Sequence, residues 1–306
     1  MKSISIAPRT FLLSVALLLV AASSQASQYK NSERLNKTVV GQFVAAVMGP
    51  VDAEKVARQV APHIIEHDPL VRSGRNGTAD WIRSMRQNAP GQAITVKHML
   101  ADGDMVFVHS QVSATPENEM GGQNRYDFYR LDGGWIVEHW VVKAPAPTRS
   151  ASGNSAFSNL YAYPSPPAPL SSDRVELNRL LVQTLSEEVF GKRNFALLDR
   201  LWAPGYIQHN PYVRNGRAAL ASVIDYIAPA GSNYRVVRSM ADGDLGVVCS
   251  HNVDAGGNVA DEFSGAAVCD IYRVNNFELV EHWDVVQQVP TSSVNGNSMF
   301  SSLYRK

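Results

Sequence analysis

The sequence predicts an α+β protein made of two tandem copies of one domain, each with helices followed by strands. Three observations carry this prediction. Five short segments of the first half recur in the second half in the same order. A proline-rich stretch separates the two halves. In each half the apolar residues first recur with a period near 3.6 and then with a period of 2, which is the change from helix to strand.

The internal repeat is ordered and nearly constant in its offset of 140 to 143 residues. The matching pairs are residues 67–75 and 209–217, 101–104 and 241–244, 127–130 and 270–273, 137–140 and 280–283, and 153–158 and 296–301. Coincidence does not explain five ordered matches, so the chain is a duplication. Any activity should therefore belong to the repeated unit.

Residues 1–26 have the layout of a secretory signal peptide. Lys2 and Arg9 form a positive start, residues 11–22 are almost all apolar, and Ser24 and Ala26 supply small residues before a cleavage point. The apolar run is short for a membrane span. We expect a periplasmic or secreted protein with no membrane attachment after cleavage; an uncleaved anchor is the alternative.

Residues 163–169 contain four prolines, which exclude a helix or a central strand and favour an extended linker. The expected organisation has four parts: a signal peptide (1–26), a first domain (32–161), a linker (162–172) and a second domain (173–306).

The second copy shows the expected elements most clearly. Helices are predicted over residues 173–190, 195–201 and 217–227, the first capped by Ser172 or Asp173. Strands are predicted over 236–240, 246–253, 263–274 and 277–286. The first copy has matching helical patterns at 35–47, 53–60 and 78–88. An antiparallel sheet that curls over its helices could enclose a pocket for a small, largely apolar ligand.

Composition excludes several classes of function. Without Lys2 and Arg9 the formal charge is −2, which gives no basic surface for nucleic acid. No phosphate-binding glycine loop, Gly-x-Ser-x-Gly elbow or Cys-x-x-Cys motif occurs, so we expect no cofactor. Cys249 and Cys269 fall on neighbouring predicted strands, where a disulfide and two buried thiols are both open.

Three segments carry a family resemblance: residues 206–211 (YIQHNP), 240–244 (MADGD) and 279–287 (LVEHWDVVQ). They resemble the SnoaL-like polyketide cyclase family of the nuclear transport factor 2-like superfamily. The resemblance implies cone-shaped domains and a cofactor-free intramolecular aldol condensation. It points to Asp284 as the acidic group that moves protons; the first copy has Val141 there.

Asp284, His282 and His209 are the catalytic candidates. Asp284 follows apolar strand residues, and a carboxyl group near apolar walls has a raised pKa that suits acid–base work. His282 shares its strand face, and His209 precedes an Asn-Pro pair that restricts the local backbone. The alternatives are a solvated strand end for Asp284 and a structural role for His209.

A second group of residues is assigned to substrate binding: His251, Asp270, Arg214, His67, His109 and His139. Asp270 and its counterpart Asp127 could instead pair with the nearby Arg273 and Arg130. A metal site built from His209, His251, His282 and Asp284 is conceivable but matches no tight spacing, so we predict no metal.

Trp140 and Trp283 alternate with the inward-facing candidates, so they should point to the opposite face of the sheet. Such a patch indicates a contact surface, and we expect the two copies to pack as an internal pseudo-dimer. In the alternative, the tryptophans fill the core.

Two functions remain open. The first is a cyclase or isomerase in the second domain, with the first domain as its partner. The second is a non-catalytic exported module that binds a small apolar molecule or another partner.

Overall fold

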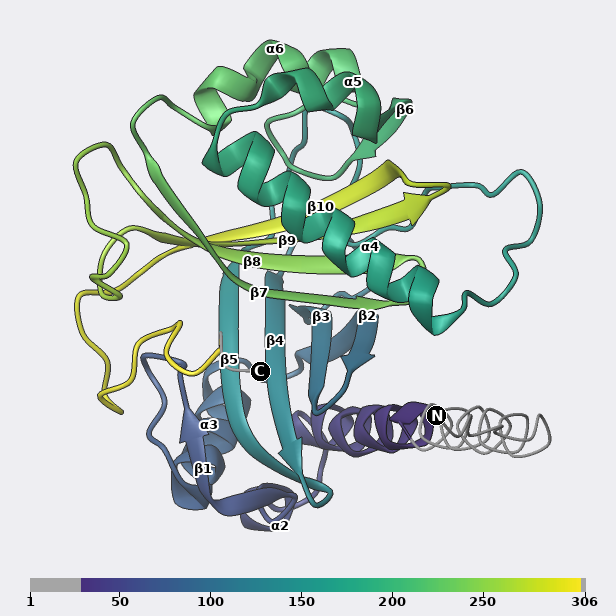
Figure 1. The fold of residues 1–306 in the computed structure, drawn as a ribbon. Coiled ribbons are helices and arrows are strands. Elements are labelled where there is room, and N and C mark those ends of the chain that lie inside the picture. Colours follow the sequence, from purple (N-terminus) through teal and green to yellow (C-terminus); the bar gives the residue numbers. More distant parts are fainter. Residues whose placement is uncertain (1–28, 304–306) are drawn as a thin grey trace, which may run out of the picture.

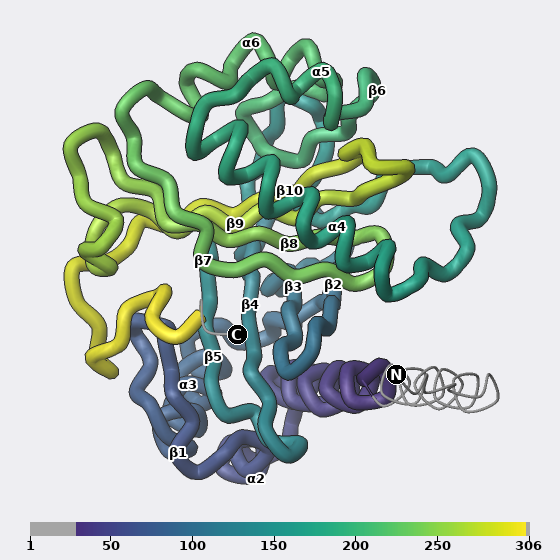
Figure 2. The backbone as a smooth tube through the Cα atoms, in the orientation of Figure 1, coloured from purple at the N-terminus to yellow at the C-terminus, as the bar shows by residue number. Residues whose placement is uncertain are grey.

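The computed structural model describes residues 29–303, in two units that repeat one order of elements (Figure 1). The predicted signal peptide lies outside the described residues. Colour along the chain in Figure 2 shows unit 1 (residues 29–161) passing into unit 2 (residues 173–303) through the linker. Every helix within residues 29–303 is too short or too polar to span a membrane. The predicted α+β class is confirmed.

Unit 1 starts with helical residues 29–47 within the described range. Its further elements are α2 (Ala53–Ala57), β1 (Val60–Glu66), α3 (Arg75–Asn88), β2 (Ala93–Asp102), β3 (Met105–Ser113), β4 (Gln123–Asp132) and β5 (Trp135–Pro145).

Unit 2 repeats this order. Its elements are α4 (Ser172–Leu185), a π-helical turn (Ser186–Gly191), a 3-10 turn (Phe195–Leu197), α5 (Leu198–Leu201), β6 (Trp202–Gln208), α6 (Arg217–Ile227), β7 (Asn233–Asp242), β8 (Leu245–Val253), β9 (Ala266–Asn275) and β10 (Glu278–Gln288).

Local chemistry sets the helix ends. The cap of α4 is Ser171, one residue before the predicted candidates, and its hydroxyl oxygen accepts from the backbone N–H of Arg174. Gly74 and Gly216 precede α3 and α6 with φ values of 86° and 96°, a conformation that favours glycine. These glycines lie just after the repeated His-x-Pro segments and turn the chain into the helices.

Each unit has one five-stranded sheet, in the orders β1-β5-β4-β3-β2 and β6-β10-β9-β8-β7. The last four strands of each unit form the predicted antiparallel hairpins. Each sheet also contains one pairing that the sequence pattern does not predict, because β1 pairs parallel with β5 and β6 pairs parallel with β10. The short segment before each His-x-Pro element is thus a strand, and its end lies beside the middle of β5 or β10.

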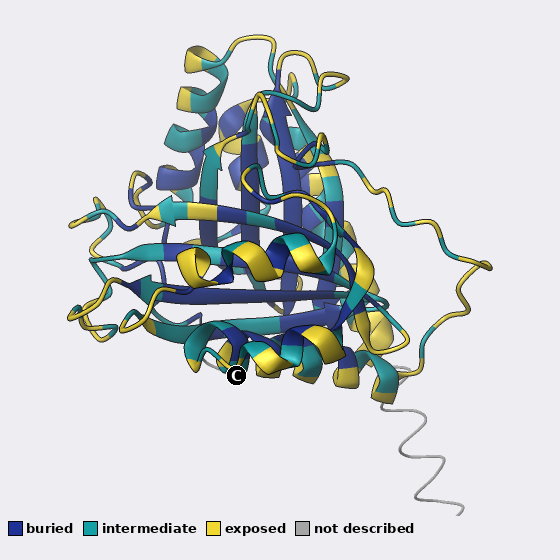
Figure 3. Cartoon of the chain, turned by 90° about the horizontal axis from the view of Figure 1, so that it is seen from above, coloured by how far each residue is buried: buried dark blue, intermediate teal, exposed yellow. Residues whose placement is uncertain are grey.

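The central strands of each sheet, such as β3 and β8, are mostly buried on both faces, while the edge strands are partly exposed (Figure 3). One face packs on the helices of its own unit, through residues such as Ile82 in unit 1 and Leu220 in unit 2. The other faces contribute to one shared apolar cluster that contains Trp140 and Trp283. The strands of the two units run crosswise where they meet (Figure 1). The tryptophans therefore lie between the sheets.

The segment that follows each sheet crosses to the other unit. Nε1 of Trp283 donates to the carbonyl oxygen of Ser158, and Nε1 of Trp140 donates to that of Ser301, both at 2.9 Å. In Figure 2 the yellow C-terminal segment lies beside the blue elements of unit 1. The repeated tails at 153–158 and 296–301 are therefore exchanged between the units.

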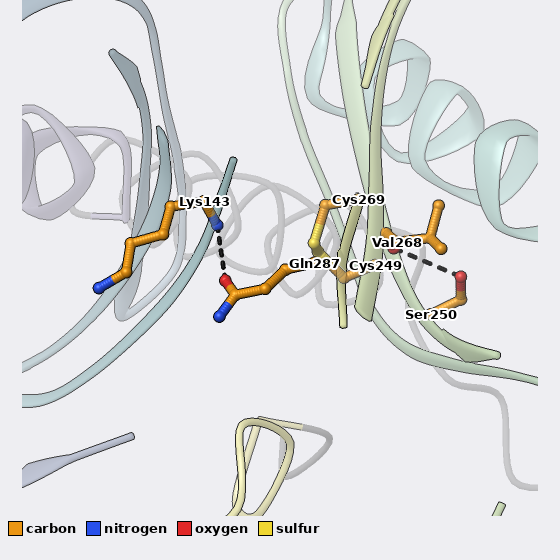
Figure 4. The surroundings of a disulfide bond; sticks show 6 residues. All are labelled: Lys143, Cys249, Ser250, Val268, Cys269 and Gln287. Atoms are coloured by element: carbon orange, nitrogen blue, oxygen red, sulfur yellow. Dashed lines mark hydrogen bonds between the residues drawn. A yellow bond between two sulfur atoms is a disulfide. The ribbon is translucent and has the colours of Figure 1, made fainter. Parts of the chain in front are cut away.

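Cys249 and Cys269 are directly paired residues of β8 and β9 and form a disulfide, with their Cα atoms 4.1 Å apart (Figure 4). The bond lies in the apolar cluster between the sheets. In unit 1 the corresponding positions hold His109 and Tyr126, whose ring centroids are 4.7 Å apart. Two aromatic rings thus fill in unit 1 the place that the disulfide takes in unit 2.

Candidate functional site

Unit 2 encloses a cavity of about 550 Å³ between its sheet and α6. Four large aromatic side chains form much of its wall: Trp202, Tyr206, Tyr234 and Tyr272. The polar lining side chains include Gln208, Asn210, Asp270, His282 and Asp284. A mostly apolar cavity with a few convergent polar groups is the usual form of a small-molecule site.

Asp270, His282 and Asp284 bring their reactive atoms together on the cavity wall. Asp270 on β9 and Asp284 on β10 are directly paired, and His282 lies two residues before Asp284 on the same strand face. One oxygen or nitrogen atom from each of the three lies within 4.8 Å of the others. The sheet pairing therefore fixes their arrangement.

The hydrogen bonds of His282 define where its protons are. Oε1 of Gln208 accepts from the backbone N–H of Asn210 at 2.9 Å and lies 2.7 Å from Nδ1 of His282. This carbonyl oxygen can only accept, so Nδ1 carries a proton. Nε2 lies 2.9 Å from Oδ1 of Asp270, and this contact needs one more proton, on the ring or on the carboxyl group. The pair holds that proton at the cavity wall.

Asp284 is the carboxyl group with a raised pKa in this cluster. Burial raises the pKa most, and the nearby charge of Asp270 adds to the effect. His282 and the hydrogen bond from Nδ2 of Asn210 oppose the rise without cancelling it. A carboxyl group of this kind can accept and return a proton closer to neutral pH than an exposed one.

Burial also raises the pKa of the Tyr206 and Tyr272 hydroxyl groups well above the ordinary value of 10. Both tyrosines therefore stay neutral at physiological pH. They offer aromatic surface and hydroxyl hydrogen bonds to a ligand, but no base.

The corresponding residues of unit 1 form an ionic cluster. Val141 pairs with Asp127 on the sheet, at the position where unit 2 has Asp284. Nε of the buried Arg125 donates to both carboxylate oxygens of Asp127, at 2.9 and 3.0 Å. Burial alone would raise the pKa of Asp127, but Arg125 and His139 outweigh it, and the pKa is lowered. Asp127 is thus held as a carboxylate.

His139 is enclosed by carboxylates. Nδ1 lies 2.8 Å from Oε1 of Glu66, where unit 2 has Gln208, and Nε2 lies 2.9 Å from Oδ1 of Asp127. Burial lowers the pKa of His139, yet Glu66 and Asp127 dominate and raise it to about 9. The ring is therefore an imidazolium at neutral pH and has no proton that it can easily exchange.

A scan against protein families matches the SnoaL-like domain twice, over residues 40–139 and 182–282, which together make up about two thirds of the chain. The chain belongs to the SnoaL-like domain family. The predicted family and its tandem duplication are confirmed.

Solved structures resemble single SnoaL-like units of this chain. An NTF2-like protein of unknown function from Mesorhizobium loti is 19% identical over 39% of this chain and 97% of its own, with a TM-score of 0.33. A protein assigned as a ketosteroid isomerase, from Kribbella flavida, is 16% identical over 37% of this chain and 79% of its own, with a TM-score of 0.31.

A protein assigned as a polyketide cyclase, from Bacillus cereus, is 18% identical over 34% of this chain and 71% of its own, with a TM-score of 0.30. A search of curated protein sequences found no significant match. The family assignment rests on the two matched segments.

Three of the nine predicted site residues line the cavity of the second SnoaL-like unit: Asp284, His282 and Asp270. His209 does not line it. Its ring stacks on Trp283 between the sheets, with centroids 4.9 Å apart, and Nε2 lies 3.0 Å from Oε1 of Glu281. Its Nδ1 lies 2.5 Å from the carbonyl oxygen of Ser155 in the tail of unit 1, so His209 docks the exchanged tail.

The other histidines also lie away from this cavity. His67 repeats the position of His209 and stacks on Trp140. His251 stacks on Phe300 of the C-terminal tail, and His109 contacts His98, both on the face between the sheets. The conceivable metal set with His209 and His251 is thus not assembled, because these rings point to the opposite face from His282.

His139 occupies the interior of unit 1, as described above. Arg214 is exposed and is absent from the cavity wall. The alternative pairing of Asp127 and Asp270 with Arg130 and Arg273 is wrong. Each arginine instead binds the glutamate of the Glu-His-Trp element in its own unit, with Nε 3.0 Å from the carboxylate of Glu138 or Glu281. Successive residues of a strand face opposite sides, which separates the aspartates from these arginines.

Sequence reasoning missed Gln208, Asn210 and the aromatic wall. The repeat contains the relevant signal, since Glu66 and Asp68 of unit 1 become the neutral Gln208 and Asn210 in unit 2. Likewise, Val60 and Ile64 correspond to Trp202 and Tyr206 through the matching strand pairings. A comparison of the two copies for changes in charge and size would have found this site.

Proposed function

We propose that unit 2 is a cofactor-independent acid–base catalyst that isomerises or cyclises a small, largely apolar carbonyl compound. One observation carries the proposal: Asp284, Asp270 and His282 converge on the wall of an aromatic cavity, and Asp284 has a raised pKa. Proton transfer beside a carbonyl group needs this combination of a base, a proton donor and an enclosing apolar surface.

In the proposed reaction, a carboxylate oxygen of Asp284 takes a proton from the carbon next to the carbonyl group. The electron pair of the broken C–H bond moves onto the carbonyl oxygen and gives an enolate. The proton shared by His282 and Asp270 forms a hydrogen bond to that oxygen and stabilises its charge. In an isomerisation, the enolate is conjugated with a C=C bond and takes the proton from Asp284 at the far carbon, which moves the double bond. In a cyclisation, the enolate carbon attacks a second carbonyl carbon of the same molecule, and the alkoxide that forms takes the proton from Asp284.

Unit 1 supports this reaction as a structural partner. Its interior has Val141 in place of the base, and its carboxylates are held by Arg125 and His139. The side-chain amide of Asn124 of unit 1 donates to the backbone carbonyl of Asp284 at 3.0 Å. Unit 1 thus contacts the strand that carries the proposed base.

Deuterium exchange tests the acid–base proposal without knowledge of the natural substrate. The ketone 2-tetralone is incubated with the protein in D2O, and loss of the protons beside its carbonyl group is followed by NMR. We expect the wild type to exceed the background rate, and Asp284→Asn to lose at least 100-fold of that excess. Asp225→Asn, on the exposed side of α6, is the matched control and should exchange like the wild type.

An equal excess in Asp284→Asn and in the wild type would contradict the role of Asp284. Binding of 2-tetralone with no exchange above background would instead support the non-catalytic binding function.

We also propose that the protein works in the periplasm or outside the cell. The pattern of residues 1–26 supports export, and the Cys249–Cys269 disulfide is of the kind that persists in an oxidising compartment. Expression of the full chain in a bacterial host should yield periplasmic protein whose N-terminal residue is Ser27. Retention of residues 1–26 in a cytoplasmic protein would contradict the proposal.

A further inference from the structure

The interior of unit 1 contains a guanidinium group at the place where unit 2 has open space. Arg125 on β4 lies two residues before Asp127, and its side chain is only 3% exposed. Its Nε donates to both oxygens of Asp127, and its guanidinium carbon lies 5.4 Å from the ring centroid of Trp81. An aspartate and an aromatic ring therefore hold a planar organic cation inside unit 1.

Unit 2 keeps the aspartate and lacks the cation. Arg125 and Lys143 are paired on the sheet of unit 1, and the matching pair in unit 2 is Val268 and Val286. Both valines line the cavity. The change from two long cationic side chains to two short apolar ones leaves space, and it removes the arginine that binds the counterpart of Asp270. The lysine charge is lost together with its own partner, because Lys143 binds Asp68 and unit 2 has Asn210 there.

The remaining charges of the cavity are predominantly negative. Asp270 and Asp284 line it beside His282, and no Lys or Arg occurs among the described residues of its wall. Even with an imidazolium at His282, one of the two carboxylates has no cationic partner. Buried carboxylates without a partner are costly, and a cation bound between them would lower that cost.

Three of the four aromatic wall residues are specific to unit 2, while Tyr272 corresponds to Tyr129 of unit 1. Trp202, Tyr206 and Tyr234 correspond to Val60, Ile64 and Ile94 of unit 1 in the matching strand pairings. Aromatic faces attract cations through their quadrupole, and organic cations more strongly when they are shielded from water.

We propose that the cavity of unit 2 binds a small organic cation, an amine or a guanidinium-like group, at the place that the Arg125 guanidinium occupies in unit 1. Asp270 and Asp284 bind its charge, and the aromatic wall covers its apolar part. This inference rests on unit 2 as the ligand-binding unit of the proposed function, and it adds a positive charge to the ligand.

Calorimetric titration with benzamidine and benzamide tests the inference, because the two are nearly the same shape and differ in charge. We expect the wild type to bind benzamidine at least 10-fold more tightly than benzamide. Asp270→Asn and Asp284→Asn should each weaken benzamidine binding at least 5-fold and leave benzamide binding unchanged. Equal affinity of the wild type for both ligands would overturn the inference.

Val268→Arg copies the residue of unit 1 and should fill the site with its own guanidinium. We expect it to lose at least 10-fold of the benzamidine affinity; undiminished affinity would contradict the inference. If this variant does not fold, the two aspartate variants decide the test, since each compares two ligands on one protein. Tight binding of ZnCl2 with no binding of benzamidine would also overturn the inference and assign a metal ion to the three side chains.

The results separate this inference from the acid–base proposal. If the protein catalyses deuterium exchange of 2-tetralone but binds benzamidine no more tightly than benzamide, only the proposal of a cationic ligand is contradicted. Preference for benzamidine without exchange would remove the catalytic proposal alone.

Discussion

Unit 1 and unit 2 place a histidine and an aspartate at the same two positions of their sheets, with opposite surroundings. In unit 1, Arg125 and Glu66 complete an ionic cluster around them. In unit 2, the corresponding residues are Val268 and Gln208, and the pair faces a cavity of about 550 Å³. One sheet position can therefore hold a fully paired ionic cluster in one copy and line a cavity in the other, after a few changes of charge and size.

The two units agree where they contact each other. In each unit one histidine and one tryptophan bind the tail of the other unit. Backbone carbonyl oxygens of the tails contact Nδ1 of His67 and His209 and accept from Nε1 of Trp140 and Trp283. The repeated motifs therefore belong mainly to the interface between the units. The main differences in charge and size lie on the opposite sheet face, which packs on the helices.

The largest expected effect comes from removing the buried cation of unit 1. Arg125→Met should lower the free energy of unfolding by about 3–5 kcal/mol, because it leaves the Asp127 carboxylate buried without its main partner. Urea denaturation measures the loss. Val268→Met at the corresponding position is the control and should change the stability by less than about 1.5 kcal/mol. If the two variants lose similar amounts of unfolding free energy, the buried charge of Arg125 does not distinguish the stability of unit 1 from that of unit 2.

The free energy of unfolding should also depend on pH through unit 1, with a smaller effect than that of Arg125→Met. The pKa of His139 is raised to about 9 from an ordinary 6.5. Protonated His139 therefore contributes on the order of 3 kcal/mol to the free energy of unfolding. This contribution is complete below pH 6.5 and is lost as the pH rises through 9. Glu66→Gln, which copies Gln208, should lack most of this dependence between pH 6 and 10. If the free energies of unfolding of the wild type and Glu66→Gln change with pH in the same way, Glu66 is not the cause of the raised pKa of His139.

The tail-docking histidines should behave alike in the two units. His67→Gln and His209→Gln should each cost about 1–3 kcal/mol, because each removes two buried hydrogen bonds of the ring, one to a glutamate and one to a backbone carbonyl of the exchanged tail. Neither should change the deuterium exchange of 2-tetralone, since both rings lie between the sheets. A 10-fold slower exchange in His209→Gln alone would show that His209 acts in the site after all.

The smallest expected effect is a gain in stability. The raised pKa of Asp284 means that its ionisation disfavours the folded state, so this cost is present above the folded pKa and absent in acid. Asp284→Asn should therefore be more stable than the wild type at pH 7, and the gain should shrink as the pH falls and vanish in acid. Asp225→Asn should stay within about 0.5 kcal/mol of the wild type. A destabilised Asp284→Asn would indicate a structural role.

The duplication, the element order and the face shared by Asp284 and His282 follow from the sequence, because repeats and strand alternation are local patterns. The parallel pairing of β1 and β6 does not, since a short strand chooses its partner through the tertiary fold. The histidine repeated beside proline favours a functional role for His209, whereas the structure places its ring between the sheets. Its partners, Ser155 and Glu281, are 54 and 72 residues away in the chain.

The contacts of Asp270 also depend on which face of β9 each side chain occupies. Arg273 is close in sequence, but it lies on the other face of β9 and binds Glu281 and Asp244. Asp270 instead contacts His282 on the neighbouring strand. Such contacts depend on the register between neighbouring strands, which cannot be derived from a single sequence.

The ionisation of Asp127 and Asp284 tests the central contrast most directly. A carbon-detected NMR titration of the aspartate carboxyl groups, assigned with Asp127→Asn and Asp284→Asn, measures both in one sample. We expect Asp284 to titrate above the ordinary value of 3.8 and Asp127 to titrate below it. Titration of both groups at one pH, or in the reverse order, would contradict this expectation.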